Sequence, residues 1–237
     1  MNIRKIFSRL RNVYVRKVCD VDKFTAWFVD GEYIRTNIEE EFTNYGQHYR
    51  FSFIPENEFW IDHERELGEE KYYIDSMLVM NRLLKKGVSH DEAVRRADKM
   101  EKSERAKGVI LAKGLGCLSK EKLLKRVRIK MIKKYCNNNL KVWIVDGELV
   151  RSLFFLDFTE GGHDKVYKFV PENEIWIDDD VKISERKFVL LHEVHERNLM
   201  LKGMCYNDAH RDSSRVEFFC RHNSEKSDLE IRKELEK

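Results

Sequence analysis

Two stretches of the chain alternate apolar and basic residues with the period of a β-strand. "VRIKMIKKY" at residues 127–135 shows the alternation clearly, and "NVYVRKV" at residues 12–18 shows it less regularly. Lysine-rich strands commonly lie at the edges of sheets, where their charge discourages pairing with another chain. We therefore expect both stretches to form edge strands.

An Asp-Gly pair follows the next apolar run in each half of the chain. Asp30-Gly31 and Asp146-Gly147 stand between apolar runs, a pattern typical of β-hairpins, because a type I′ turn needs positive φ at both central residues. Each pair is followed by two more apolar runs separated by a Pro-Glu-Asn turn. The pattern predicts an antiparallel β-meander in each half, with further strands at residues 49–54, 58–62, 166–170 and 174–178.

Apolar residues take up helical spacing after about residue 69 and again 116 residues later. Gly87 and Gly203 stand where these helices should end, because glycine adopts the left-handed conformation of a helix C-terminus without strain. Ser89 and Glu92 form a capping box that should open a further helix. We therefore expect an α+β fold in which each antiparallel β-meander is followed by two helices.

The chain contains two tandem copies of one pattern. "WFVDGEYIRT" begins at Trp27 and "WIVDGELVRS" at Trp143, and 17 of the 36 residues from 27 to 62 are identical to their partners 116 residues later. Average composition would produce roughly two or three identities by chance. A period of 116 residues is a small domain rather than a solenoid unit. We expect a first repeat at residues 1–106, a linker at 107–120, a second repeat at 121–222 and a charged C-terminal tail at 223–237.

The composition is that of a globular protein with nearly balanced charge. Of 237 residues 42% are hydrophobic, and 45 Lys and Arg against 42 Asp and Glu leave a net charge of +3. This balance argues against nucleic acid as a partner, and edge strands explain the basic runs at residues 9–17 and 125–134 more simply. The five cysteines form no C-x-x-C pair, and no apolar stretch approaches the roughly 20 residues of a membrane span. We expect a cytoplasmic protein without a membrane partner.

Residues retained at matching positions of both halves are expected to hold the common fold. Glu174 and Asp178 belong to this class and flank a tryptophan on one face of a predicted strand. They could serve as ligands, but capping of turns or pairing with the retained Arg151 is the stronger interpretation.

Six histidines and glutamates of the second half stand opposite neutral residues of the first half. The matching positions of the first half carry Gln47, Ser76, Met77, Val79, Met80 and Val94. Burial of a histidine or glutamate where the other copy has an apolar side chain is costly unless the group is paired or coordinated. This contrast predicts a specialised site in the second repeat, built from His163, His192, Glu193, His195, Glu196 and His210.

The spacing of these residues suits a metal site. His192 and Glu196 are four residues apart and share a helix face. His210 lies on the next helix, which can fold back after the glycine at position 203. The three side chains could converge around zinc or another divalent metal and leave a coordination position for water, which Glu193 would activate as a general base. Additional ligands, or residues that orient a ligand, would be His163, Glu174 or Asp178.

"HEVHE" at residues 192–196 resembles the H-E-x-x-H helix of the zincin metallopeptidases, in which two histidines bind zinc and the intervening glutamate activates water. The resemblance covers residues 192–210 and implies that His192 is a ligand and Glu193 the catalytic base. Glu196 stands where the second histidine of the motif belongs, and His195 comes one position early. The ligand set is therefore either His192, Glu196 and His210, or one in which His195 substitutes with altered geometry.

Three functions follow as hypotheses. The leading one is a metal-dependent hydrolase, with peptidase as its specific form, in which the second repeat holds the site and the first repeat supports it. The alternative is a non-catalytic protein-binding or scaffold module, which would present an exposed apolar patch to a peptide or protein partner. Nucleic-acid binding is the weakest of the three, and it would show as an affinity that falls steeply with salt.

Overall fold

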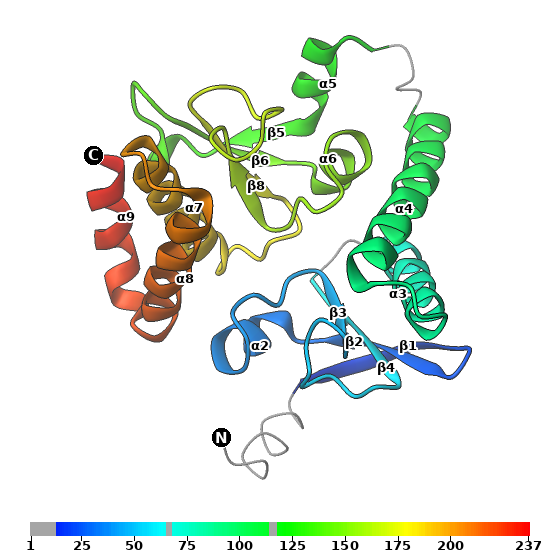
Figure 1. Cartoon of the computed structure of the whole chain (residues 1–237). Coiled ribbons are helices and arrows are strands. Elements are labelled where there is room, and N and C mark those ends of the chain that lie inside the picture. Colours follow the sequence, from blue (N-terminus) through cyan, green and yellow to red (C-terminus); the bar gives the residue numbers. More distant parts are fainter. Residues whose placement is uncertain (1–12, 65–67, 114–117) are drawn as a thin grey trace. The chain divides into compact units, whose positions relative to one another are not determined.

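The computed structural model describes residues 13–64, 68–113 and 118–237 (Figure 1). The chain divides into two compact units, residues 1–116 and 117–237, and each unit contains helices and a four-stranded sheet. The predicted α+β class and the similarity of the two halves are thereby confirmed. Arg9 and Arg11 of the first basic run lie outside the described residues. No helix within the described ranges has the length and apolar character needed to cross a membrane.

The first unit consists of β1 (Tyr14–Val21), β2 (Phe24–Val29), α2 (Gly31–Asn37), β3 (Tyr45–Gln47), β4 (Glu58–Asp62), α3 (Glu70–Lys85) and α4 (His90–Lys113). Its strands lie in the order β1-β2-β4-β3. β1 is antiparallel to β2 and forms one edge of the sheet, as its basic residues predict. β2 and β4 are parallel, and β3 is antiparallel to β4.

The second unit repeats this order and adds a helix at its C-terminus. Its strand order β5-β6-β8-β7, with β6 parallel to β8, is the same as in the first unit. β5 forms an edge of the sheet, again as predicted. The elements are α5 (Lys120–Val127), β5 (Arg128–Met131), η1 (Lys133–Tyr135), β6 (Lys141–Val145), α6 (Gly147–Leu153), β7 (Gly161–His163), β8 (Glu174–Asp178), α7 (Arg186–Leu201), α8 (Tyr206–His222), η2 (Ser224–Lys226) and α9 (Ser227–Leu235).

The sheets are mixed, so the prediction of an antiparallel β-meander was wrong. Parallel neighbours need a crossover connection, and α2 and α6 lie within the crossovers from β2 to β4 and from β6 to β8. The Asp-Gly pairs begin these helices instead of forming hairpin turns. The side chains of Asp30 and Asp146 accept hydrogen bonds of 2.8 Å from the backbone N–H groups of Tyr33 and Leu149. Aspartate is as good a helix N-cap as a turn residue, and for that reason the dipeptide alone was ambiguous.

The glycine of each Asp-Gly pair is required by a close approach of two elements. A Cβ atom at Gly147 would lie 2.2 Å from carboxyl atoms of Asp178, and one at Gly31 would lie 1.9 Å from the carboxyl of Asp62. The absence of a side chain therefore lets β8 place its terminal aspartate against the start of α6, and β4 does the same with α2.

The strands predicted at residues 49–54 and 166–170 are turns, and the short strands β3 and β7 precede them. The aromatic side chains of these turns still pack: Phe51 contacts Phe42 with ring centroids 5.5 Å apart, and Tyr167 contacts Phe158 at 5.9 Å. A short apolar run indicates that a segment is buried but does not by itself show that it is a strand. For this reason the prediction of strands at these two segments was wrong.

The helices that follow each sheet begin and end as predicted. Gly87 and Gly203 have φ values of 77° and 91°, and each is followed by a residue whose N–H reaches back to the carbonyl five positions earlier, closing the helix in a Schellman motif. α4 begins directly after Ser89 and continues through residue 113, so the first half of the predicted linker is helical.

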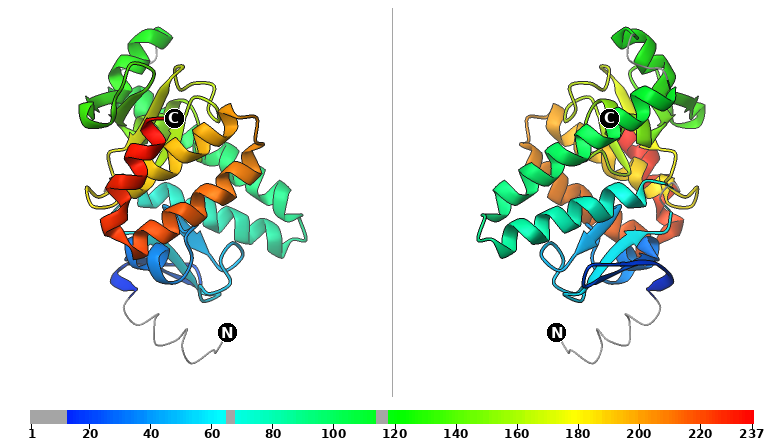
Figure 2. Two further views of the ribbon diagram at one scale, coloured as in Figure 1. Left: turned by 90° about the vertical axis from the view of Figure 1, so that its left-hand side faces the viewer. Right: turned by 90° about the vertical axis from the view of Figure 1, so that its right-hand side faces the viewer.

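Residues 223–237 form η2 and α9 rather than a charged tail. The fully buried side chain of Ile231 belongs to the core of the second unit. α9 packs against α7, and α7 contacts β7 and β8 (Figures 1 and 2). Apolar residues at intervals along this short, charged segment, Ile231 and Leu235, pack on the core of the second unit.

Candidate metal centre

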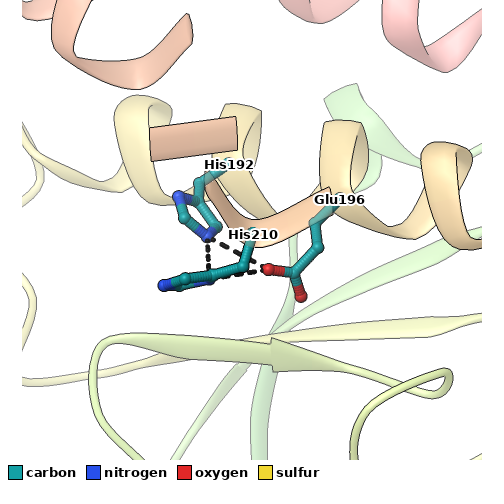
Figure 3. A group of neighbouring side chains, drawn as sticks. All are labelled: His192, Glu196 and His210. Atoms are coloured by element: carbon teal, nitrogen blue, oxygen red, sulfur yellow. Dashed lines mark hydrogen bonds and ion pairs between the residues drawn. The ribbon is translucent and has the colours of Figure 1, made fainter. Parts of the chain in front are cut away.

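Three side chains from α7 and α8 converge at one point (Figure 3). Glu196 Oε2 lies 2.7 Å from His210 Nδ1, and His192 Nε2 lies 3.1 Å from His210 Nδ1 and 3.5 Å from Glu196 Oε2. His192 and Glu196 lie one turn apart on α7, as their spacing predicted, and α8 supplies the third side chain. The structure thus brings together the first of the two ligand sets expected from the sequence.

The position of His210 depends on how α8 returns along α7. The left-handed Gly203 ends α7, and α8 then runs in contact with it. Ala209 and Ser213 are completely buried on α8, and the Ser213 hydroxyl donates to the carbonyl of Ala209. Small residues at these buried positions allow the two helices to approach closely, which places His210 beside His192.

A carboxylate behind His192 orients its ring. Nδ1 of His192 lies 2.9 Å from Glu217 Oε2, and Glu217 in turn accepts hydrogen bonds of 2.7 and 3.0 Å from Arg221. Burial raises the pKa of Glu217, but the hydrogen bond from His192 and the charge of Arg221 outweigh it and lower this pKa to about 2. The ionised carboxylate therefore accepts a hydrogen bond from Nδ1–H of His192, and Nε2 of the same ring faces Glu196 and His210.

The ion network behind His192 exists in both units. Arg221 pairs with Glu217 and Glu185, and in the first unit Arg105 pairs with the matching Glu101 and Glu69. The same residue types stand at these three positions in both halves of the sequence. Two retained charges four residues apart on one helix were the signal that could have shown a buried pair. In the second unit a histidine, His192, contacts this shared framework, whereas the first unit carries Ser76 at the matching position.

Glu196 is held by three histidines, since its second oxygen contacts His163. Oε1 of Glu196 lies 2.9 Å from Nε2 of His163, whose side chain is completely buried on β7. Burial raises the pKa of Glu196, but the hydrogen bonds from His163, His192 and His210 outweigh it and hold this pKa well below its usual range. Glu196 is therefore an anion at neutral pH, surrounded by nitrogen donors.

Glu193 lies next to this group. Its carboxylate, Glu196 and His163 offer ligand atoms within 4.8 Å of one another. A Cβ atom at Gly161 would lie 3.2 Å from the Glu193 side chain, so the glycine in β7 makes room for it. Burial of the carboxyl group is the largest effect on Glu193, and it raises the pKa of this residue to about 7.

His195 points away from the group that contains His192 and Glu196. Its Nδ1 lies 2.8 Å from Glu234 on α9, and its Nε2 lies 3.2 Å from Asp212 on α8. Among the described residues, the groups able to hold a metal do not include His195. Helix geometry explains the difference, because the consecutive residues His195 and Glu196 lie about 100° apart around α7, so that His195 contacts α9 while Glu196 contacts His163 and His210.

Glu174 and Asp178 have structural partners. Glu174 accepts hydrogen bonds from Arg128 and from the Trp176 indole, and Asp178 pairs with the buried Arg151. Asp178 also lies close to two further aspartates at the end of β8, but Arg151 pairs with Asp180 as well, and Asp179 accepts from the N–H of Gly147. The predicted pairing of Asp178 with the retained arginine is what the structure shows, and neither carboxylate joins the group around Glu196.

Replacing Glu234 by alanine should loosen α9. Glu234 accepts from His195 and from Asn198, and these hydrogen bonds, which outweigh the opposing effect of burial, help to lower its pKa to about 2. Hydrogen bonds to a charged group contribute about 1.5–3 kcal/mol each. Amide hydrogen exchange of residues 227–235 should therefore accelerate. The exposed Glu236→Ala variant is the control, and equal exchange in both variants would contradict the assigned role.

Comparison with known proteins identifies no relative: no protein-family model matches the chain, and neither the curated proteins nor the solved structures contain a significant match.

Proposed function

We propose that the second unit is a metal-dependent hydrolase that binds zinc or a similar divalent ion through His192, Glu196 and His210. The convergence of their three ligand atoms carries the proposal. In a tetrahedral zinc site with bonds of 2.0–2.1 Å, neighbouring ligand atoms are about 3.3 Å apart. The separations of 2.7, 3.1 and 3.5 Å bracket that value, so small side-chain adjustments would admit an ion.

The surroundings of the three atoms also favour a cation. Two imidazoles and one carboxylate are a donor set used by catalytic zinc, and three protein ligands leave a position for water. His192 is backed by a carboxylate, Glu217, as metal-binding histidines commonly are. Such an ion would lower the pKa of a bound water and polarise a substrate carbonyl. Glu193, which lies beside Glu196, would accept the proton of that water.

The first unit provides a comparison within the same chain. At the positions of His192 and Glu196 it carries Ser76 and Met80, and Met80 lies 3.5 Å from the Gln47 amide. The first copy has the same strand order with neutral side chains at these two positions, so the shared fold does not require a charge there. This contrast supports a ligand role over a purely structural one.

A protein-binding module is the second candidate, and one observation favours it. Phe218 and Phe219 are exposed on α8, where the first unit carries Lys102 and Ser103. Exposed aromatic residues suit contact with a peptide or protein. This function requires no metal, and the metal content of the protein therefore separates the two candidates.

The decisive experiment is elemental analysis of the untagged protein after incubation with Zn²⁺ and desalting. We expect about one equivalent of zinc in the wild-type protein, none in His192→Ala, and an unchanged amount in the matched first-unit variant Ser76→Ala. Metal-loaded protein would then be assayed on peptides and esters. A wild-type protein that retains no zinc, or a His192→Ala variant that retains it fully, would overturn the proposal.

A further inference from the structure

We infer that His163 is not a metal ligand but a positioning residue, which donates a hydrogen bond to one oxygen of Glu196 and leaves the other oxygen for the metal. The inference rests on the proposed function and assigns the coordination of the same site. His163 was a candidate ligand by sequence, and its Nε2 lies close enough to Glu196 and Glu193 to suggest a second metal position. The backbone around His163 excludes that role.

The proton on the His163 ring is located by a backbone group. The N–H of Lys165 donates to Nδ1 of His163 at 3.1 Å. A backbone N–H can only donate, so Nδ1 uses its lone pair here, and the proton of the neutral ring must reside on Nε2. Nε2 faces Oε1 of Glu196 at 2.9 Å, where it donates to the carboxylate. Coordination of a metal through Nε2 would leave the ring with no proton at all.

His192 has the opposite arrangement. Its Nδ1 donates to the ionised Glu217, and Nε2 is the nitrogen that faces Glu196 and His210. A metal can therefore bind Nε2 of His192 while the ring keeps its other proton. The two histidines therefore have different roles. The role of each ring is determined by the group that contacts its Nδ1 atom.

The turn that supplies the Lys165 N–H is itself anchored. Asp164 accepts a hydrogen bond of 2.7 Å from Arg197 on α7 and another from the N–H of Asn173. These contacts tie the end of β7 to the helix that carries Glu196. The donor, His163, and the acceptor, Glu196, are therefore held in fixed positions relative to each other. This restricts the movement of the Glu196 carboxylate before any ion binds.

The first unit shows that an amide can replace the imidazole. Gln47 occupies the position of His163 and donates from its Nε2 to Met80, the residue that matches Glu196. A glutamine at position 163 should therefore still present an N–H to Glu196, whereas a leucine cannot. If His163 were a ligand, both substitutions would remove a bond to the metal.

The test is titration of the metal-free full-length protein with Co²⁺, followed by its visible absorption, in wild type, His163→Gln and His163→Leu. Loss of an outer partner of a metal ligand typically weakens affinity about 10–100-fold, which we expect for leucine, while glutamine stays within about threefold of wild type. X-ray absorption of the zinc-loaded wild type and glutamine variant should show two imidazole ligands in each. The first-unit variant Gln47→Leu should bind Co²⁺ like the wild type.

Three results would overturn the inference. Three imidazoles on zinc in the wild type, or equal losses for glutamine and leucine, would make His163 a ligand. Wild-type affinity in the leucine variant would remove the positioning role while leaving the proposed metal site intact. Absence of Co²⁺ and Zn²⁺ binding in the wild type would instead overturn the proposed function, and this inference with it.

Discussion

Glu196→Gln is expected to lower the affinity of the protein for Zn²⁺ by more than about 100-fold, because outer partners of a metal ligand alone contribute 10–100-fold. Oε2 of Glu196 contacts both His192 and His210. Glutamine keeps the volume of the side chain but removes its charge. A loss of Zn²⁺ affinity would therefore show that the carboxylate coordinates the metal, and would not reflect a change in packing. Competition of the protein with a chromophoric chelator measures the change.

Glu193→Gln is the matched control for this variant. It removes a neighbouring carboxylate on the same helix, and zinc affinity should stay within a few-fold of wild type because Glu193 lies outside the three-residue ligand group. If hydrolysis is established, this variant should lose about 10²–10⁴-fold in turnover, the usual contribution of a general base. Equal zinc loss in both variants would show that Glu193 is a ligand and would contradict its assignment as the base.

Arg151→Met is expected to destabilise the second unit by about 3–5 kcal/mol, the usual result of leaving a buried charge without its partner. Arg151 and Asp178 are 1% and 0% exposed, and the arginine also donates to the carbonyl of Phe158. Their ion pair joins α6 to the end of β8. Urea unfolding followed by tryptophan fluorescence measures the loss.

Two further variants separate charge from packing. Adding Asp178→Asn to Arg151→Met removes the unpaired charge, so the double variant should recover part of the lost stability. Arg35→Met should have a similar effect on the first unit, since Arg35 pairs with the buried Asp62 at 2.8 Å. A loss below about 1 kcal/mol for Arg151→Met would show that this ion pair is dispensable.

Much of the secondary structure followed from local pattern. The glycines at positions 87 and 203 marked helix ends because a left-handed residue is needed there whatever the surroundings. The alternation of apolar and basic residues correctly predicted that β1 and β5 are edge strands. The Asp-Gly pairs misled because the same two residues suit a hairpin and a helix start, and only the parallel pairing of β2 with β4 and of β6 with β8 distinguishes them.

By itself the sequence determined that the protein is an α+β duplication and that ionisable residues gather in its second copy, because both facts are carried by residue identity at a constant offset. Only the tertiary structure decided which of these residues meet. Glu196 faces His210 because of how α7 and α8 pack, and His195 faces α9 because the C-terminal segment folds back. The roles of His163 and His192 differ for the same reason: the atom that meets each Nδ1 is brought there by the fold, through contacts that no local pattern encodes.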